Sequence, residues 1–141
     1  MADDKTHVEV EKFTADGDVD AKFKAKAIDS MTKAAQAAIK GSKTLTLDAP
    51  KQKGAKGWWL FGNLVSLGPD KAGKNFEAKV SMSISTRPAK SMKAFPEGSG
   101  AFAIDSPDEK ISPGDVDQIV TAAVRKAMTS AVPFMEKTKP Q

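Results

Sequence analysis

The chain has 141 residues, 40% of them hydrophobic and 28% charged, which is the ordinary balance of a folded domain and excludes an intrinsically disordered chain. No run approaches the roughly 18 apolar residues of a membrane-spanning helix, and the acidic first twenty residues do not have the pattern of a signal peptide. Because cysteine is absent, disulfides, thiolate metal sites and cysteine nucleophiles are excluded as well.

We therefore expect one soluble domain over residues 1–141, without a membrane span and with flexible ends at about 1–5 and 136–141. The compartment stays open. The chain would be cytoplasmic as it stands, and periplasmic or extracellular if a signal segment has been removed from it.

The net charge of +4 is unevenly distributed, since residues 1–20 carry −5 and residues 49–93 carry +7. A basic middle segment is one feature of proteins that bind anionic partners such as nucleic acid. However, only Arg87 and Arg125 of the 22 cations are arginine, and lysine lacks the planar fork that reads phosphates and base edges. A solvated basic surface is the simpler interpretation.

The first predicted elements are a strand and a helix. Val8 and Val10 alternate with charged residues, which predicts a strand with one buried face. Asp18 is the predicted N-cap of the next element, in which apolar residues recur every three or four positions from Val19. This pattern predicts an amphipathic helix that ends at Gly41.

Three strands are predicted in the middle of the chain. Residues 44–47 alternate, residues 58–67 are apolar and β-rich, and residues 76–84 alternate without a slip. Residues 68–75 between the last two contain two glycines and a proline, as expected of a hairpin connection. Residues 58–67 and 76–84 are therefore predicted to be antiparallel partners.

The C-terminal third contains an irregular segment, a strand and a helix. Residues 86–100 hold two prolines and two glycines and are predicted to be a structured excursion without regular elements, followed by a fifth strand at 101–105. Ser112 as N-cap with Asp115 at the third position predicts the start of a long amphipathic helix. Pro133 is expected to end or kink this helix.

The predicted order of elements is β-α-β-β-β-β-α. It indicates an α+β domain with a single, mostly antiparallel sheet of about five strands and both helices packed on one face. The other face of the sheet would then be open to solvent and available for function.

The motifs that suggest chemistry are better explained as structural features. Residues 68–75 match G-x-x-x-x-G-K, but asparagine stands where a phosphate loop needs serine or threonine, and a strand follows where a helix is needed. His7 is the sole histidine and is expected to be an exposed strand residue. Asp105, Asp108 and Glu109 lack the spacing of a calcium loop. We predict no catalytic, metal-binding or cofactor-binding residues.

The candidates for a contact surface are apolar. Trp58 and Trp59 are adjacent on a predicted strand, so they must point to opposite faces, one into the core and one outward. An outward tryptophan could anchor a protein contact, unless segment 86–100 covers it. The candidate partner-binding residues are Trp58, Trp59, Lys53, Lys56, Met92 and Phe95.

The order of elements resembles that of the domain shared by the curli-secretion channel protein, the N-terminal domain of the TolB translocation protein and the lipoprotein activator of penicillin-binding proteins. The resemblance rests on the helix from Val116 to Val132 followed by Phe134 and Met135, and on the glycine-bearing strand WWLFGNLVSL at 58–67. It implies a non-enzymatic adaptor in an envelope or secretory assembly. The chain lacks the lipid-anchor cysteine of the lipoproteins.

The leading hypothesis is a non-catalytic binding or assembly module that acts through protein–protein contacts, including self-association at a sheet edge. The first alternative is a nucleic-acid-binding protein. Its contacts would be Lys51, Lys53, Lys56, Lys71, Lys74 and Lys79. The second alternative, a small enzyme, would need a pocket with converging carboxylates.

Overall fold

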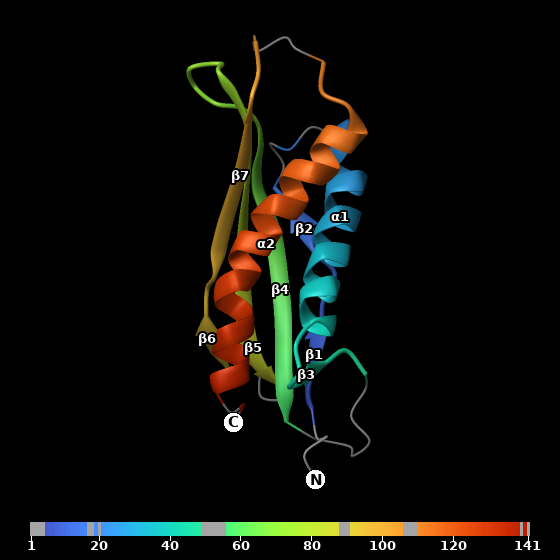
Figure 1. The fold of residues 1–141 in the computed structure, drawn as a ribbon, viewed down its shortest axis with the longest axis vertical. Helices are drawn as coiled ribbons and strands as arrows, with labels where there is room; N and C mark the ends of the chain where they lie inside the picture. The colour runs from blue at the N-terminus through green and yellow to red at the C-terminus, as the bar shows by residue number, and fades with distance from the viewer. Residues whose placement is uncertain are drawn as a thin grey trace.

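The computed structural model describes residues 5–16, 19, 21–48, 56–87, 91–105, 110–138 and 140. They form two layers, a twisted sheet and a pair of helices that cover one of its faces (Figure 1). The elements are β1 (Thr6–Val10), β2 (Thr14–Ala15), α1 (Ala21–Lys40), β3 (Leu45–Thr46), β4 (Gly57–Pro69), β5 (Asn75–Arg87), β6 (Met92–Ala94), β7 (Glu97–Ala103) and α2 (Pro113–Lys137).

The predicted α+β class is confirmed, but the sheet has seven strands and mixed pairing. The order is β3-β1-β4-β5-β6, with β2 also beside β4 and β7 also beside β5. The strands β1 and β2 run parallel to β4, whereas β5 is antiparallel to β4, β6 and β7. The sheet therefore consists of a long central hairpin with an interrupted strand path along each side.

The central hairpin matches the sequence prediction. The strands β4 and β5 have 13 residues each and pair along their whole length, with one irregularity between Leu64 and Ser66. Their inward side chains, such as Leu60 and Ile84, are buried under the helices. The turn between them closes with Gly73 at a φ of 69°, a conformation that favours glycine.

The prediction for residues 86–100 is wrong, because this segment supplies β6 and more than half of β7. The two glycines that suggested an irregular path are instead the places where α2 lies against the strand. A Cβ atom on Gly98 would be 2.0 Å from the carbonyl oxygen of Ala123, and one on Gly100 would be 2.8 Å from that of Ile119. The glycines thus allow the main chains of α2 and β7 to touch.

Both helices begin or end largely as expected. The predicted N-cap of α1, Asp18, lies outside the described residues, and α1 ends at Lys40, next to Gly41. Ser112 and Asp115 form the predicted capping box, with hydrogen bonds of 3.1 and 2.9 Å between side chain and backbone in both directions. However, Pro133 does not end α2, which continues to Lys137.

Two hydroxyl–carboxylate hydrogen bonds hold the helical layer together. The Ser30 hydroxyl on α1 donates to Asp117 on α2 at 2.6 Å. The Ser42 hydroxyl, just after α1, donates to Glu136 near the end of α2, also at 2.6 Å. Both serines are buried, so each bond to a charged acceptor is partly shielded from water. The two helices are therefore joined at both ends of their contact.

Candidate binding surface

The open face of the sheet carries a stripe of apolar side chains along β4. Inward and outward positions alternate on this strand, and Trp59, Phe61 and Val65 point away from the helices. Trp59 and Phe61 are half-buried, and Val65 is exposed. The strand has no charged residue in its 13 positions. We call Trp59, Phe61 and Val65 the β4 stripe.

Small polar side chains border the β4 stripe. Ser85 and Ser83 on β5 are the direct cross-strand partners of Trp59 and Phe61. Side chains of paired residues lie on the same face of a sheet, and a serine is much shorter than an aromatic ring. On the β5 side the rings of the stripe therefore stand next to short, uncharged side chains, whereas on the β1 side Trp59 pairs with the exposed Glu9.

Exposed apolar residues extend this surface to the edge of the sheet. Met92 on β6 pairs with Ser85, which in turn pairs with Trp59, so all three lie in one row across the open face. Met92 is 60% exposed. Phe95, in the short break between β6 and β7, is 64% exposed but lies at the edge on the side of α2. Such large exposed side chains near one another are a mark of interaction sites in folded proteins.

The structure separates the two tryptophans as predicted and identifies the inner one. Trp58 is fully buried and packs against Phe134 of α2, with ring centroids 5.7 Å apart. Its indole nitrogen is buried without a hydrogen-bond partner in the part of the chain that is described. Trp58 therefore belongs to the core and leaves the candidate surface. Leu60 and Leu64 follow Trp58 by two and six residues, and this even spacing on a strand indicates that all three side chains lie on the same buried face.

The remaining predicted contact residues are only partly brought together. Trp59 and Met92 share a row, while Phe95 lies at the edge beside α2. Lys56 is exposed just before β4, and Lys53 lies outside the described residues. Sequence reasoning missed Phe61 and Val65, although their spacing from Trp59 by two and six residues indicates the same face of a strand.

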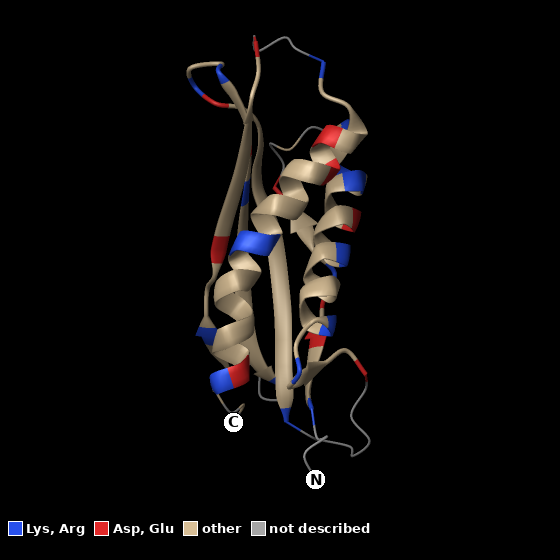
Figure 2. Cartoon of the chain, in the orientation of Figure 1, with Lys and Arg blue, Asp and Glu red and all other residues tan. Residues whose placement is uncertain are grey.

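The lysines of the basic segment do not form one patch. Lys56 precedes β4, whereas Lys71 and Lys74 lie in the turn at the far end of the hairpin, roughly 40 Å away for a 13-residue strand. Lys79 lies between these ends. Figure 2 shows the charged positions scattered over both layers, and Lys51 lies outside the described residues. This arrangement gives a nucleic acid no continuous basic track among the described lysines.

The segment that matches G-x-x-x-x-G-K is a hairpin turn, as expected. The Asp70 carboxylate accepts hydrogen bonds from the Lys74 backbone at 3.0 Å and from the Asn75 side chain at 3.1 Å. The bond from Asn75, assisted by those from the backbone, lowers the pKa of Asp70 and outweighs the opposing effect of desolvation. The N–H groups of Asp70, Gly73 and Lys74 thus donate within the turn.

The prediction that His7 is exposed is wrong, since this residue is only 5% exposed. Its Nδ1 atom lies 2.7 Å from the backbone carbonyl of Asp48, and its Nε2 atom lies 3.9 Å from a carboxylate oxygen of Glu9. Among the described residues, no group of three histidine or acidic side chains is placed to hold a metal ion. Asp108 and Glu109 lie outside those residues.

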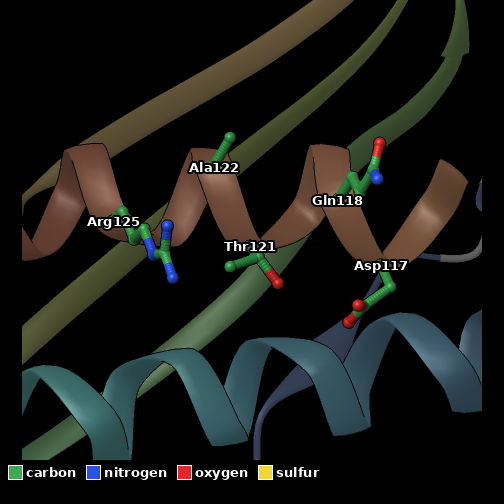
Figure 3. Close-up of a pocket in the computed structure, with 5 residues that line it drawn as sticks. All are labelled: Asp117, Gln118, Thr121, Ala122 and Arg125. Atoms are coloured by element: carbon green, nitrogen blue, oxygen red, sulfur yellow. The ribbon is translucent and has the colours of Figure 1, made fainter. Parts of the chain in front are cut away.

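A shallow polar groove lies on the opposite side of the molecule, along α2 (Figure 3). Asp117, Thr121 and Arg125 line it on the side of α1, and Asp117 is already bound by Ser30. Its charges are mixed, and none of its described lining residues has a buried polar atom without a hydrogen-bond partner. The open face is therefore the better candidate surface.

None of the described helices is long and apolar enough to cross a membrane.

Comparison with known proteins shows the fold but no sequence family. The chain matches no family model, and no curated protein is detectably similar in sequence. A Xanthomonas campestris protein of the family DUF330 superposes with a TM-score of 0.60 at 14% identity, over 92% of this chain and 83% of that one.

Two further structures are similar over most of their length. A Caulobacter crescentus protein described as a lipoprotein gives a TM-score of 0.55 at 12% identity, over 95% of this chain and 93% of that one. The PelC dodecamer of Paraburkholderia phytofirmans gives 0.53 at 9% identity, over 92% and 89%. These likenesses support the expected resemblance at the level of element arrangement. The chain therefore has the fold that these three bacterial proteins share.

Proposed function

We propose that this chain is a non-catalytic adaptor that binds a protein partner through the open face of its sheet, within a bacterial envelope or secretion assembly. The observation that carries the proposal is the β4 stripe on an uncharged central strand, bordered by serines on its β5 side and continued there by Met92. Aromatic side chains and methionine are the residue types enriched where proteins meet, and charged side chains are depleted there.

The composition of the open face favours a protein over a nucleic acid. Stacking on single-stranded nucleic acid needs aromatic rings within a positively charged groove. Here the rings of Trp59 and Phe61 lie beside Ser85 and Ser83, and the described lysines of the basic segment are spread between both ends of the hairpin. We therefore expect no binding to oligonucleotides even at low salt, where such binding would be strongest.

The structural comparisons support the setting of the proposal. One similar structure is described as a lipoprotein, and another is the PelC dodecamer. A second copy of this chain is therefore one partner to be considered for the open face, beside a different envelope protein.

Site-specific crosslinking tests the proposal. A photoreactive phenylalanine analogue at Phe61 would replace a half-buried ring of the β4 stripe by one of similar shape. The matched control carries the same group at Lys33, an exposed position on α1. We expect a discrete protein adduct from Phe61 in cells and none from Lys33, and its mass distinguishes a second copy from another protein. Equal crosslinking at both positions, or none at Phe61, would contradict the proposal.

Substitution of the tryptophans provides a second test. Trp59→Ala is expected to abolish the adduct while the chain stays folded, because its ring is only half-buried. Trp58→Ala is expected to lower the stability by about 3–5 kcal/mol, as for other fully buried aromatic residues. If both variants unfold the chain alike, the outward tryptophan is structural and the proposal loses its support.

A further inference from the structure

The outer side of β7 is a row of backbone groups that no other described strand pairs with. This strand has β5 as its neighbour, and the carbonyl of Pro96 and the N–H of Ile104 both bond toward β5. Since the N–H and C=O of one residue point to the same side of a strand and alternate along it, Glu97, Ser99, Ala101 and Ala103 direct theirs away from the sheet.

The usual protection of such an edge is weak here. Natural edge strands carry lysines, prolines or inward charges that prevent another strand from pairing. After Glu97, the strand β7 has no charged residue and no proline through Ala103, and the exposed side chains at Ser99 and Ala101 are small. As far as the described residues show, the edge is therefore sterically and electrostatically open to a strand over about six residues.

Two cavities lie on opposite faces of the sheet beside this edge. One, of about 440 Å³, lies on the helix side, where the rings of Phe95 and Phe134 line it together with polar Ser130. The other, of about 400 Å³, lies on the open-face side, where Lys79 and Ser99 line it together with apolar Val65. Glu97 lines both cavities. Successive side chains of an added strand point to opposite faces and would reach one cavity after the other.

The helical layer argues against a second copy as the occupant. Two β7 strands paired around a twofold axis would be about 4.8 Å apart. The main chain of α2 lies directly on β7 at Gly98 and Gly100, so the two α2 helices would come far closer than the 8–10 Å that packed helices need. A single extended segment brings no helix with it. The side chains on one face of that segment would then lie next to α2.

We propose that the β7 edge binds an extended segment of a partner protein by strand addition, with a bulky apolar side chain of that segment in the helix-side cavity. This inference goes beyond the proposed function, because it concerns a second surface, and it specifies the partner: a stretch of about six residues in which apolar side chains alternate with polar ones. Main-chain hydrogen bonds to Glu97, Ser99, Ala101 and Ala103 would provide the affinity. The cavity beside Phe95 would provide selectivity for the side chain of the bound segment.

The inference is tested by selecting, from a displayed library of random nine-residue peptides, those that bind the full chain. The selected peptides should alternate apolar and polar residues, and their affinity is measured by fluorescence anisotropy. Ala101→Pro removes an outward N–H without touching the bonds to β5, and it should weaken binding at least about tenfold, as for the loss of one good hydrogen bond. Ala101→Thr, which keeps the N–H, is the control.

A second pair of variants tests the cavity. Ser130→Trp places an indole in the helix-side cavity from an exposed position of α2 and should abolish binding of peptides with a large central side chain. Arg125→Trp, on the side of α2 that faces α1, should leave binding unchanged (Figure 3).

The outcomes separate this inference from the proposed function. Selected peptides that bind Ala101→Pro like the original chain, or that show helical spacing, would overturn strand addition. If such peptides instead lose binding with Phe61→Ser, the open face binds proteins and the edge inference alone fails. If no peptide is selected and Phe61 gives no crosslink, both are wrong.

Discussion

The contact between α2 and β7 makes a quantitative prediction for Gly98→Ala. The new Cβ atom would lie 2.0 Å from the carbonyl oxygen of Ala123, while ordinary contacts begin at 3.4 Å. Because both atoms belong to main chains in regular elements, the helix must lift off the sheet by about 1.4 Å. A gap of this order forfeits a quarter to a half or more of the dispersion energy of the atoms on either side.

We expect Gly98→Ala to lower the free energy of unfolding by about 2–4 kcal/mol, at the upper end for overpacked cores. For a chain of this size, that corresponds to a fall in Tm of roughly 6–12 °C. Urea denaturation followed by circular dichroism measures it, with an unchanged m-value as evidence that the same structure unfolds.

Gly68→Ala is the matched control for this measurement. Nothing lies within 4 Å of a Cβ atom at Gly68, so the substitution should be neutral or stabilise the chain by about 0.4–1 kcal/mol through the unfolded state. If Gly98→Ala differs from Gly68→Ala by less than about 0.5 kcal/mol, the main-chain contact of α2 with β7 is absent and the reasoning is refuted.

Three further measurements test other parts of the structure. Ser30→Ala leaves Asp117 without its hydroxyl donor and should cost about 1.5–3 kcal/mol; a double-mutant cycle with Asp117→Ala should recover most of it as coupling energy, and zero coupling would contradict the bond. Ser112→Ala removes the N-cap of α2 and should cost about 1 kcal/mol in urea denaturation, whereas Ser112→Asp should be near neutral. Because the folded-state pKa of Asp70 is lowered, its stabilising effect is present above the unfolded pKa of about 3.9 and is lost as the pH falls through the folded value. Wild type should therefore lose more stability between pH 5 and pH 2 than Asp70→Asn, and equal losses would contradict this.

The elements that were predicted correctly are those whose signals lie close together in the chain. The capping box needs only Ser112 and Asp115, and the central hairpin follows from uninterrupted alternation at 76–84 and a glycine-rich turn. Such patterns express period and local hydrogen bonding, which do not depend on the rest of the fold. The prediction that one face of the sheet is open to solvent followed from the same alternation of apolar and polar residues.

The errors arose where a distant segment decides the outcome. His7 occupies an outward position of β1, but the carbonyl of Asp48, 41 residues later, lies against its ring and buries it. Gly98 and Gly100 have the composition of a loop, and only the approach of α2 explains their place in a strand. Likewise the two cavities beside β7 exist only after β5, β7 and α2 have assembled, so no local motif encodes them.

The interruptions that flank the central hairpin bear on aggregation. Open-ended fibres grow when a molecule offers two long, pairable borders, so that every added chain presents a fresh one. Here the far border is divided among β1, β2 and the two-residue β3. Among the described strands, a chain that pairs with a partner strand at β7 therefore has no pairable run of similar length on the other flank, and we expect addition to stop after one partner.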